Sequence, residues 1–273
     1  MIDIILQMFS YPFLIRAFLV GILVSVALAL LGVTLVLKRQ SMLGDGLSHV
    51  GFGAISVALA LNVAPLYIAI PVMVLAAFLL LRLKNSKVNS DAAIAVISSS
   101  SIAVGITAAA CSGGMNTDVY GYMFGSILSV TKGDVIISSV LCAVTVLVFV
   151  LFYNKIFATT FDPNFAAASG TKTRPFDVLF ALLTACAIVI GMRVMGTMLI
   201  SGLIVFPALS AIGVCKSFKS TVIFASLSAT VAFFVGMIAS YAFAYIPAGA
   251  AIVLANLILF GIITLTKKLR GAK

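Results

Sequence analysis

The chain has 273 residues, of which 63% are hydrophobic and only 9% are charged, and its mean hydropathy is +1.29. A water-soluble domain is about half apolar and about a quarter charged, so water is not the solvent for most of this surface. The net charge of +10 does not indicate nucleic-acid binding, because the basic residues form short clusters between long apolar runs, as in membrane proteins.

The apolar runs predict membrane-spanning helices. Only helices and closed barrels satisfy every backbone polar group in lipid, and long continuous runs favour helices. We therefore predict an all-α fold: a polytopic transmembrane helical bundle of eight or nine spans, with residues 1–273 forming a single transmembrane domain. The candidate spans are 13–37, 44–62, 64–82, 90–112, 133–153, 175–193, 195–214, 219–244 and 247–266.

The basic residues also predict the orientation. With the N-terminus outside and the C-terminus inside, every Lys and Arg except Arg16, Lys132 and Arg193 lies in or beside an inside segment. The opposite orientation would reverse this asymmetry.

Two segments between spans show features of their own. The apolar piece 119–130 is expected to be interfacial or re-entrant, with Asp118, Lys132 and Asp134 as solvated loop charges around it.

The inside segment 154–174 is too short to fold alone. Asp162 and Pro163 suit the start of a short helix within it, and Gly170 suits its end.

Residues 39–54, RQSMLGDGLSHVGFGA, contain the most informative pattern. Asp45 and His49, the latter the one histidine of the chain, are four residues apart and would share a helix face, with Ser41 and Ser48 nearby. A carboxylate and an imidazole suit Zn²⁺ or Mn²⁺, and two ligands suit a transport path that must release its ion. The alternative is a buried hydrogen-bonded pair that only helps to pack the helix.

The small residues around this pattern have mainly structural interpretations. The four nearby glycines would let another backbone approach closely, and Asp91 suits a helix N-cap. Serines at positions 98–101 would either return hydrogen bonds to their helix or line a polar path. The glycines are Gly44, Gly46, Gly51 and Gly53.

Several functional classes conflict with the sequence. The sequence has no GxxxxGK[ST] motif, the phosphate-binding loop of many ATPases. We therefore expect that this chain is not itself an ATPase enzyme. The energy for transport would have to come from a partner chain or from an ion gradient. One histidine and no glutamate exclude an HExxH metalloprotease, and Met42 breaks the GxGD motif of intramembrane aspartyl proteases. A secondary cation transporter driven by an ion gradient remains the alternative function, although one Asp–His pair is few ligands for coupled transport.

Several motifs together resemble the membrane subunits of zinc, manganese and iron ABC importers. RQSMLGDGLSH is similar to the family pattern R-x-S-x-x-G-D-x-x-x-H, and Asp91 begins a span as the family's Asp does. The further similar segments, in the same order, are 117–134 (TDVYGYMFGSILSVTKGD), 161–170 (FDPNFAAASG), 195–211 (MGTMLISGLIVFPALSA) and 247–254 (PAGAAIVL). One departure is Tyr245-Ile246 before the last motif, where many relatives carry an acid.

The resemblance implies a function and partners. It implies a homodimeric permease in a prokaryotic cell membrane, with a cytoplasmic ATP-binding subunit, an extracytoplasmic metal-binding protein and surrounding lipid. The divalent metal would be the transported substrate, with no permanently bound cofactor; YMFGSIL resembles zinc members more than manganese ones. The family's metal residues fall on Asp45 and His49, and its coupling segment, about 160–172, on Asp162, Pro163, Phe165, Ala167 and Gly170.

The predicted orientation can be tested by labelling single cysteines from either side of the membrane. We expect positions in 154–174 and in the tail after residue 267 to be labelled from the inside, and positions near 112–132 from the outside. A tail labelled from the outside would overturn both the orientation and the coupling assignment.

Overall fold

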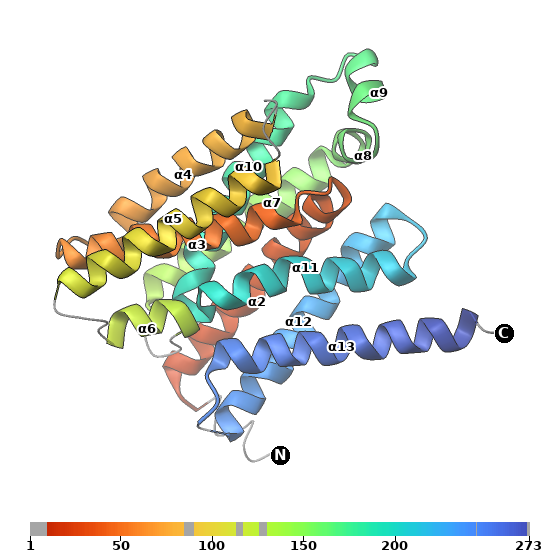
Figure 1. The fold of residues 1–273 in the computed structure, drawn as a ribbon. Helices are drawn as coiled ribbons and strands as arrows, with labels where there is room; N and C mark the ends of the chain where they lie inside the picture. Colours follow the sequence, from red (N-terminus) through yellow and green to blue (C-terminus); the bar gives the residue numbers. More distant parts are fainter. Residues whose placement is uncertain (1–9, 85–89, 113–116, 126–129, 244, 272–273) are drawn as a thin grey trace.

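The computed structural model describes residues 10–84, 90–112, 117–125, 130–243 and 245–271. Within these ranges the chain forms helices joined by short turns, with no strand, as predicted (Figure 1). The helices are α2 (Pro12–Leu37), α3 (Ser41–Ala60), α4 (Pro65–Lys84), α5 (Ser90–Cys111), α6 (Thr117–Phe124), α7 (Lys132–Leu151), α8 (Tyr153–Phe161), α9 (Pro163–Ala168), α10 (Thr173–Met195), α11 (Thr197–Val214), α12 (Phe218–Ala242) and α13 (Ala248–Gly271).

Eight of the described helices are long and apolar enough to cross a membrane, in agreement with the prediction of eight or nine spans: α2, α3, α4, α5, α7, α10, α12 and α13. The ninth candidate, 195–214, corresponds to α11, which counts as a shorter apolar helix over Leu199–Val214. It is separated from α10 by Gly196, whose φ of +81° is a left-handed conformation that favours glycine.

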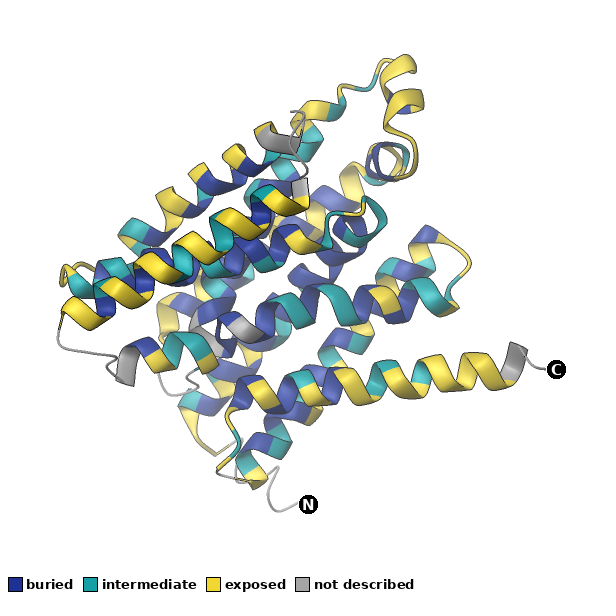
Figure 2. Cartoon of the chain, in the orientation of Figure 1, coloured by how far each residue is buried: buried dark blue, intermediate teal, exposed yellow. Residues whose placement is uncertain are grey.

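Helix α2 lies at the centre of the bundle and packs against α7, α10, α11 and α12. Helix α3 is also mostly buried, whereas α4, α5, α12 and α13 keep most of their side chains on the outside. Figure 2 shows this outer exposure along α5 and α13. The exposed side chains include Val96, Val104, Ile258 and Leu265, as expected where lipid rather than water is the neighbour.

The apolar piece 119–130 forms α6 at its start, and residues 126–129 lie outside the described part. Helix α6 packs against α10, α11 and α13. A Cβ atom at Gly249 would lie 2.6 Å from the Phe124 carbonyl oxygen and 2.7 Å from that of Met195. Gly249 therefore lies where the ends of α6 and α10 meet the start of α13.

The expectation of a solvated charge at position 134 was wrong. Asp134 is 5% exposed and belongs to a capping box at the start of α7. Its carboxylate accepts hydrogen bonds from the backbone N–H and the hydroxyl of Thr131, both at 2.8 Å. These bonds replace the water that the carboxylate gives up on burial. Lys132 is exposed, as expected, and the side chain of Asp118 lies outside the described set.

The close approach of α3 and α5 depends on glycine. A Cβ atom at Gly105 would lie 2.8 Å from the Cα atom of Gly53, and one at Gly53 would collide with the Ser101 carbonyl oxygen. Backbone atoms cannot swing aside as a flexible side chain could, so larger residues would push the helices apart.

We expect Gly53→Val to lower the free energy of unfolding by about 1–3 kcal/mol, because the added methyl groups would overlap the α5 backbone. Gly261→Val in α13 is the matched control, since nothing lies within 4 Å of a Cβ atom there; it should change stability by at most about 0.5 kcal/mol. Thermal unfolding of the purified protein in detergent measures both. Equal melting temperatures for the two variants would contradict this packing.

Candidate metal site on α3

The turn before α3 is held by a long-range ion pair. The Nζ atom of Lys38 lies 2.7 Å from the Asp177 Oδ1 atom in α10 and 5.4 Å from the centre of the Phe180 ring. The Lys38 side chain is only 8% exposed, and Arg39 beside it has a φ of +57°. The pair thus ties the sharp turn between α2 and α3 to α10, and this fixes where α3 begins.

The glycines of α3 face neighbours on two sides. A Cβ atom at Gly46 would lie 2.5 Å from Ile94 of α5, while one at Gly44 would lie 2.6 Å from Ile204 of α11. Gly51 faces the sulfur atom of Met192 in α10 in the same way, at 2.7 Å. The predicted role of these glycines in close packing is confirmed, and α3 is held between α5 on one side and α10 and α11 on the other.

Asp45 and His49 lie on the face of α3 that these contacts leave open. The distance from the Nε2 atom of His49 to the Oδ2 atom of Asp45 is 3.7 Å, which is too long for a hydrogen bond. The side chains are 26% exposed for His49 and 43% exposed for Asp45. The spacing argument correctly placed both on one face, but the pair is neither buried nor directly hydrogen-bonded.

The neighbouring serine does not complete a ligand set. Ser48 is fully buried, and its hydroxyl donates a 2.7 Å hydrogen bond to the backbone carbonyl of Asp45. Among the described residues, no group of three or more His, Cys, Asp or Glu side chains is placed to hold a metal ion. Asp45 and His49 therefore offer two side-chain ligands, fewer than the four that zinc sites usually have.

The location of the pair constrains what lies opposite it. An ionisable side chain within a membrane span costs at least a few kcal/mol in contact with lipid, and such groups face the bundle interior, a watery cavity or a partner. Because the side chains of Asp45 and His49 remain partly exposed in this chain, their surroundings would be water or another protein surface rather than lipid.

The serines of α5 bond to their own helix. Ser99 donates to the carbonyl of Ala95 at 2.5 Å, and Ser101 donates to that of Ile97 at 2.7 Å. For these two the structure favours the backbone interpretation over a polar path. Asp91 was predicted to cap α5, but the helix begins at Ser90 and Asp91 lies inside its first turn, where a carboxylate still favours the helix dipole.

The predicted short helix in segment 154–174 is α9, which stands with α8 at one end of the bundle (Figure 1). The Asp162 Oδ1 atom caps it by accepting a 2.9 Å hydrogen bond from the N–H of Phe165, and Pro163 occupies the first turn. At the other end, Gly170 has a φ of +84°, and the N–H of Thr171 donates to the Ala166 carbonyl, which completes a Schellman motif.

The side chains of α9 divide into an anchored and a free set. Ala166 is fully buried, whereas Phe165 is 66% exposed and Ala167 is also exposed. An exposed aromatic ring on a short, well-capped helix is available to contact another protein.

This architecture defines a multi-span helical membrane protein of the permease class, with a polar pair on one central helix and a capped helix projecting from one end. Residues 10–267 match the ABC 3 transport family. The chain belongs to that family, and it is a multi-pass protein of the plasma membrane and a permease of metal ABC importers.

Similar proteins support this family assignment. The chain is 30% identical over 252 residues to the manganese import system permease protein ScaB of Streptococcus gordonii, covering 92% of this chain and 90% of the relative. It is 27% identical over 262 residues to the high-affinity zinc uptake system membrane protein ZnuB of Haemophilus influenzae, covering 95% and 99%. Its fold matches a chain of PsaBC from Streptococcus pneumoniae, solved in complex with Fab, with a TM-score of 0.86, 29% identity and coverage of 99% and 100%.

Proposed function

We propose that this permease conducts a divalent transition-metal ion into the cytoplasm past Asp45 and His49, with zinc as the favoured substrate and manganese or iron as the other candidates. The observation that carries the proposal is the partly exposed Asp–His pair on a helix that is otherwise mostly buried in the bundle. The relatives named above include both manganese and zinc permeases, so the preference for zinc rests on the YMFGSIL segment alone.

The chemistry of the pair suits a transient site. A carboxylate oxygen and an imidazole nitrogen bind Zn²⁺, Mn²⁺ and Fe²⁺, while neither is a soft thiolate ligand that would retain zinc strongly. The 3.7 Å separation leaves both side chains free of a mutual hydrogen bond, so each keeps lone pairs available. Two ligands supplemented by water would release the ion readily, as conduction requires.

A second copy of the chain would complete this arrangement. A symmetric dimer places the same face of each subunit opposite its counterpart, so two Asp–His pairs could meet at the axis. We propose a homodimer for this reason: it removes the half-exposed carboxylate from lipid and doubles the number of ligands. One pair with water or hydroxyl ligands is the alternative coordination.

Energy would come from a separate ATP-binding subunit that docks on α9. The capped ends of this helix, formed by Asp162, Pro163 and Gly170, would keep it rigid enough to transmit a displacement, and the exposed Phe165 and Ala167 would form the contact. An extracytoplasmic metal-binding protein would deliver the ion at the opposite face.

Metal-stimulated ATP hydrolysis is the direct test of substrate choice. We expect the complex reconstituted in liposomes with its ATP-binding subunit and binding protein to respond most strongly to Zn²⁺ among Zn²⁺, Mn²⁺ and Fe²⁺. A stronger response to Mn²⁺ would correct the metal. Uptake driven by an ion gradient without ATP would support the secondary transporter instead.

For the metal path, we expect Asp45→Asn and His49→Gln to abolish metal uptake while insertion and binding of the ATP-binding subunit stay normal, because both changes keep polarity and size but remove a ligand. Met42→Leu, on the exposed start of the same helix, is the control and should transport normally. Metal soaked into crystals of the wild-type protein should lie about 2.0–2.2 Å from both side chains if it is zinc. Near-normal uptake by the two isosteric variants, or their degradation, would show that the pair only supports folding.

For coupling, we expect Phe165→Ala to weaken binding of the ATP-binding subunit and to uncouple ATP hydrolysis from uptake, with the permease still folded, because this ring is exposed. Ala167→Asp should act in the same direction. Tyr245→Ala removes an aromatic ring that is 81% exposed between α12 and α13 and should leave this binding unchanged. Co-purification and the ratio of ATP hydrolysed to metal transported are the measurements. Unaltered assembly and coupling in both α9 variants would rule out this contact.

A further inference from the structure

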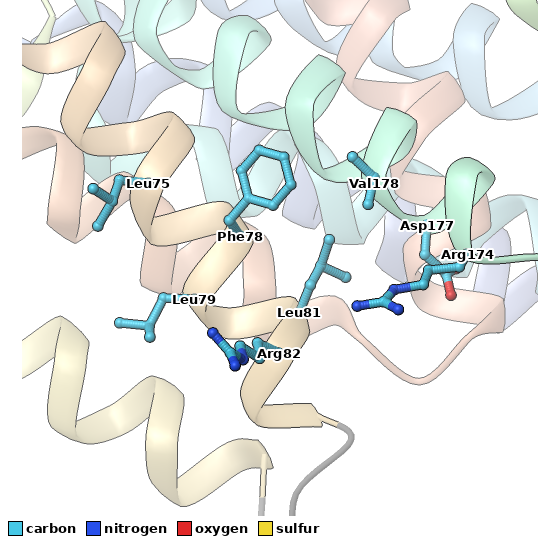
Figure 3. Close-up of a pocket in the computed structure, with 8 residues that line it drawn as sticks. All are labelled: Leu75, Phe78, Leu79, Leu81, Arg82, Arg174, Asp177 and Val178. Carbon is cyan, nitrogen blue, oxygen red and sulfur yellow. The ribbon is translucent and has the colours of Figure 1, made fainter.

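A groove between α4 and α10 combines apolar walls with a basic rim (Figure 3). Its volume is about 580 Å³, and it does not include Asp45 or His49. Leu75, Phe78 and Leu79 of α4 and Val178 of α10 form the walls, while Arg82 and Arg174 lie at the rim. Figure 3 shows the two guanidinium groups at the same end of the two helices.

The rim carries excess positive charge. The carboxylate of Asp177 lies beside Arg174 but is already bound to Lys38 at 2.7 Å. This end of the groove therefore has three cationic side chains nearby and one carboxylate, which Lys38 already binds. Arg82 and Arg174 are both exposed, and neither forms an ion pair within the part of the chain that the structure describes.

The position of the arginines in the spans gives the groove a direction. Arg82 is the last residue of its apolar span, and Arg174 is the second residue of the span that begins at Thr173. Phe78 and Leu75 are one and two turns deeper along α4, and they are 47% and 67% exposed. The groove thus runs from a cationic rim at the membrane interface into an apolar wall within the hydrocarbon layer.

We propose that this groove is a binding site for an anionic phospholipid. The guanidinium groups of Arg82 and Arg174 donate hydrogen bonds to the headgroup phosphate, and an acyl chain lies along Leu75, Phe78 and Leu79. Two planar, permanently charged donors match a phosphate well, and basic pockets between membrane helices select anionic headgroups.

The alternatives explain less of this geometry. A free phosphate ion would use the rim but not the apolar wall. The ATP-binding subunit works in water, whereas most of the groove wall belongs to the spans. The headgroup phosphate of a bound lipid would also join the charged cluster of Arg174, Asp177 and Lys38. This cluster positions the turn before α3.

The test is native mass spectrometry of the purified permease titrated with phosphatidylglycerol, with phosphatidylcholine as the zwitterionic comparison. Each basic residue contributes about fivefold to attraction by anionic lipid, so R82Q/R174Q should bind phosphatidylglycerol about 25-fold more weakly. K216Q/K219Q removes the same charge from two exposed positions, Lys216 between α11 and α12 and Lys219 in the first turn of α12, and should bind like the wild type. F78A/L79A should weaken binding without any change in charge, and inorganic phosphate should not compete.

Three results would overturn the proposal. The first is equal phosphatidylglycerol binding by R82Q/R174Q and K216Q/K219Q. The second is effective competition by inorganic phosphate, which would indicate a simple anion site. The third is loss of the ATP-binding subunit from R82Q/R174Q with lipid binding intact, which would indicate a protein interface. If R82Q/R174Q does not fold, R82K/R174K keeps the charge but loses bidentate donation, and wild-type affinity and headgroup preference in that variant would equally overturn it.

Discussion

The close packing of α3 against its neighbours is the constraint on which the candidate metal site depends. Gly46 and Gly53 admit α5 on one side, while Gly44 and Gly51 admit side chains of α11 and α10 on the other. Helix α4 also packs against α3, and Asp45 and His49 lie on the part of the helix surface that stays partly exposed. The sequence of small residues therefore determines where the Asp–His pair points, although none of the glycines offers a side-chain ligand.

The carboxylates show how a membrane protein accommodates charge. Asp134 is satisfied by a capping box, Asp162 caps α9, and Asp177 binds Lys38. Among the described residues, Asp45 differs because its contact is the longer one to His49, and because it stays 43% exposed. The first three have partners that explain them structurally. The partial exposure of Asp45 and its lack of a short contact to His49 are the physical basis for proposing a metal path here.

One end of the bundle concentrates features that face the aqueous side and the lipid interface. Helix α9 projects there, the turn between α2 and α3 is anchored there by Lys38, and the basic rim of the groove between α4 and α10 lies beside that anchor. A displacement of α9 by a partner and occupancy of the groove by a lipid would both act on the start of α10. Helix α10 also packs against α3, which carries the candidate metal site.

The sequence by itself determined the features that depend on residues near one another in the chain. Continuous apolar runs defined the spans, Asp162 and Gly170 marked the ends of α9, and the i, i+4 spacing placed Asp45 and His49 on one face. These signals could be interpreted because hydropathy, capping and helical periodicity operate within a few residues. Only the tertiary structure decided that this face is open, that Asp134 is buried, and that Lys38 pairs with Asp177, 139 residues away. Such contacts depend on which helices pack together, and nothing local in an apolar run specifies its neighbour.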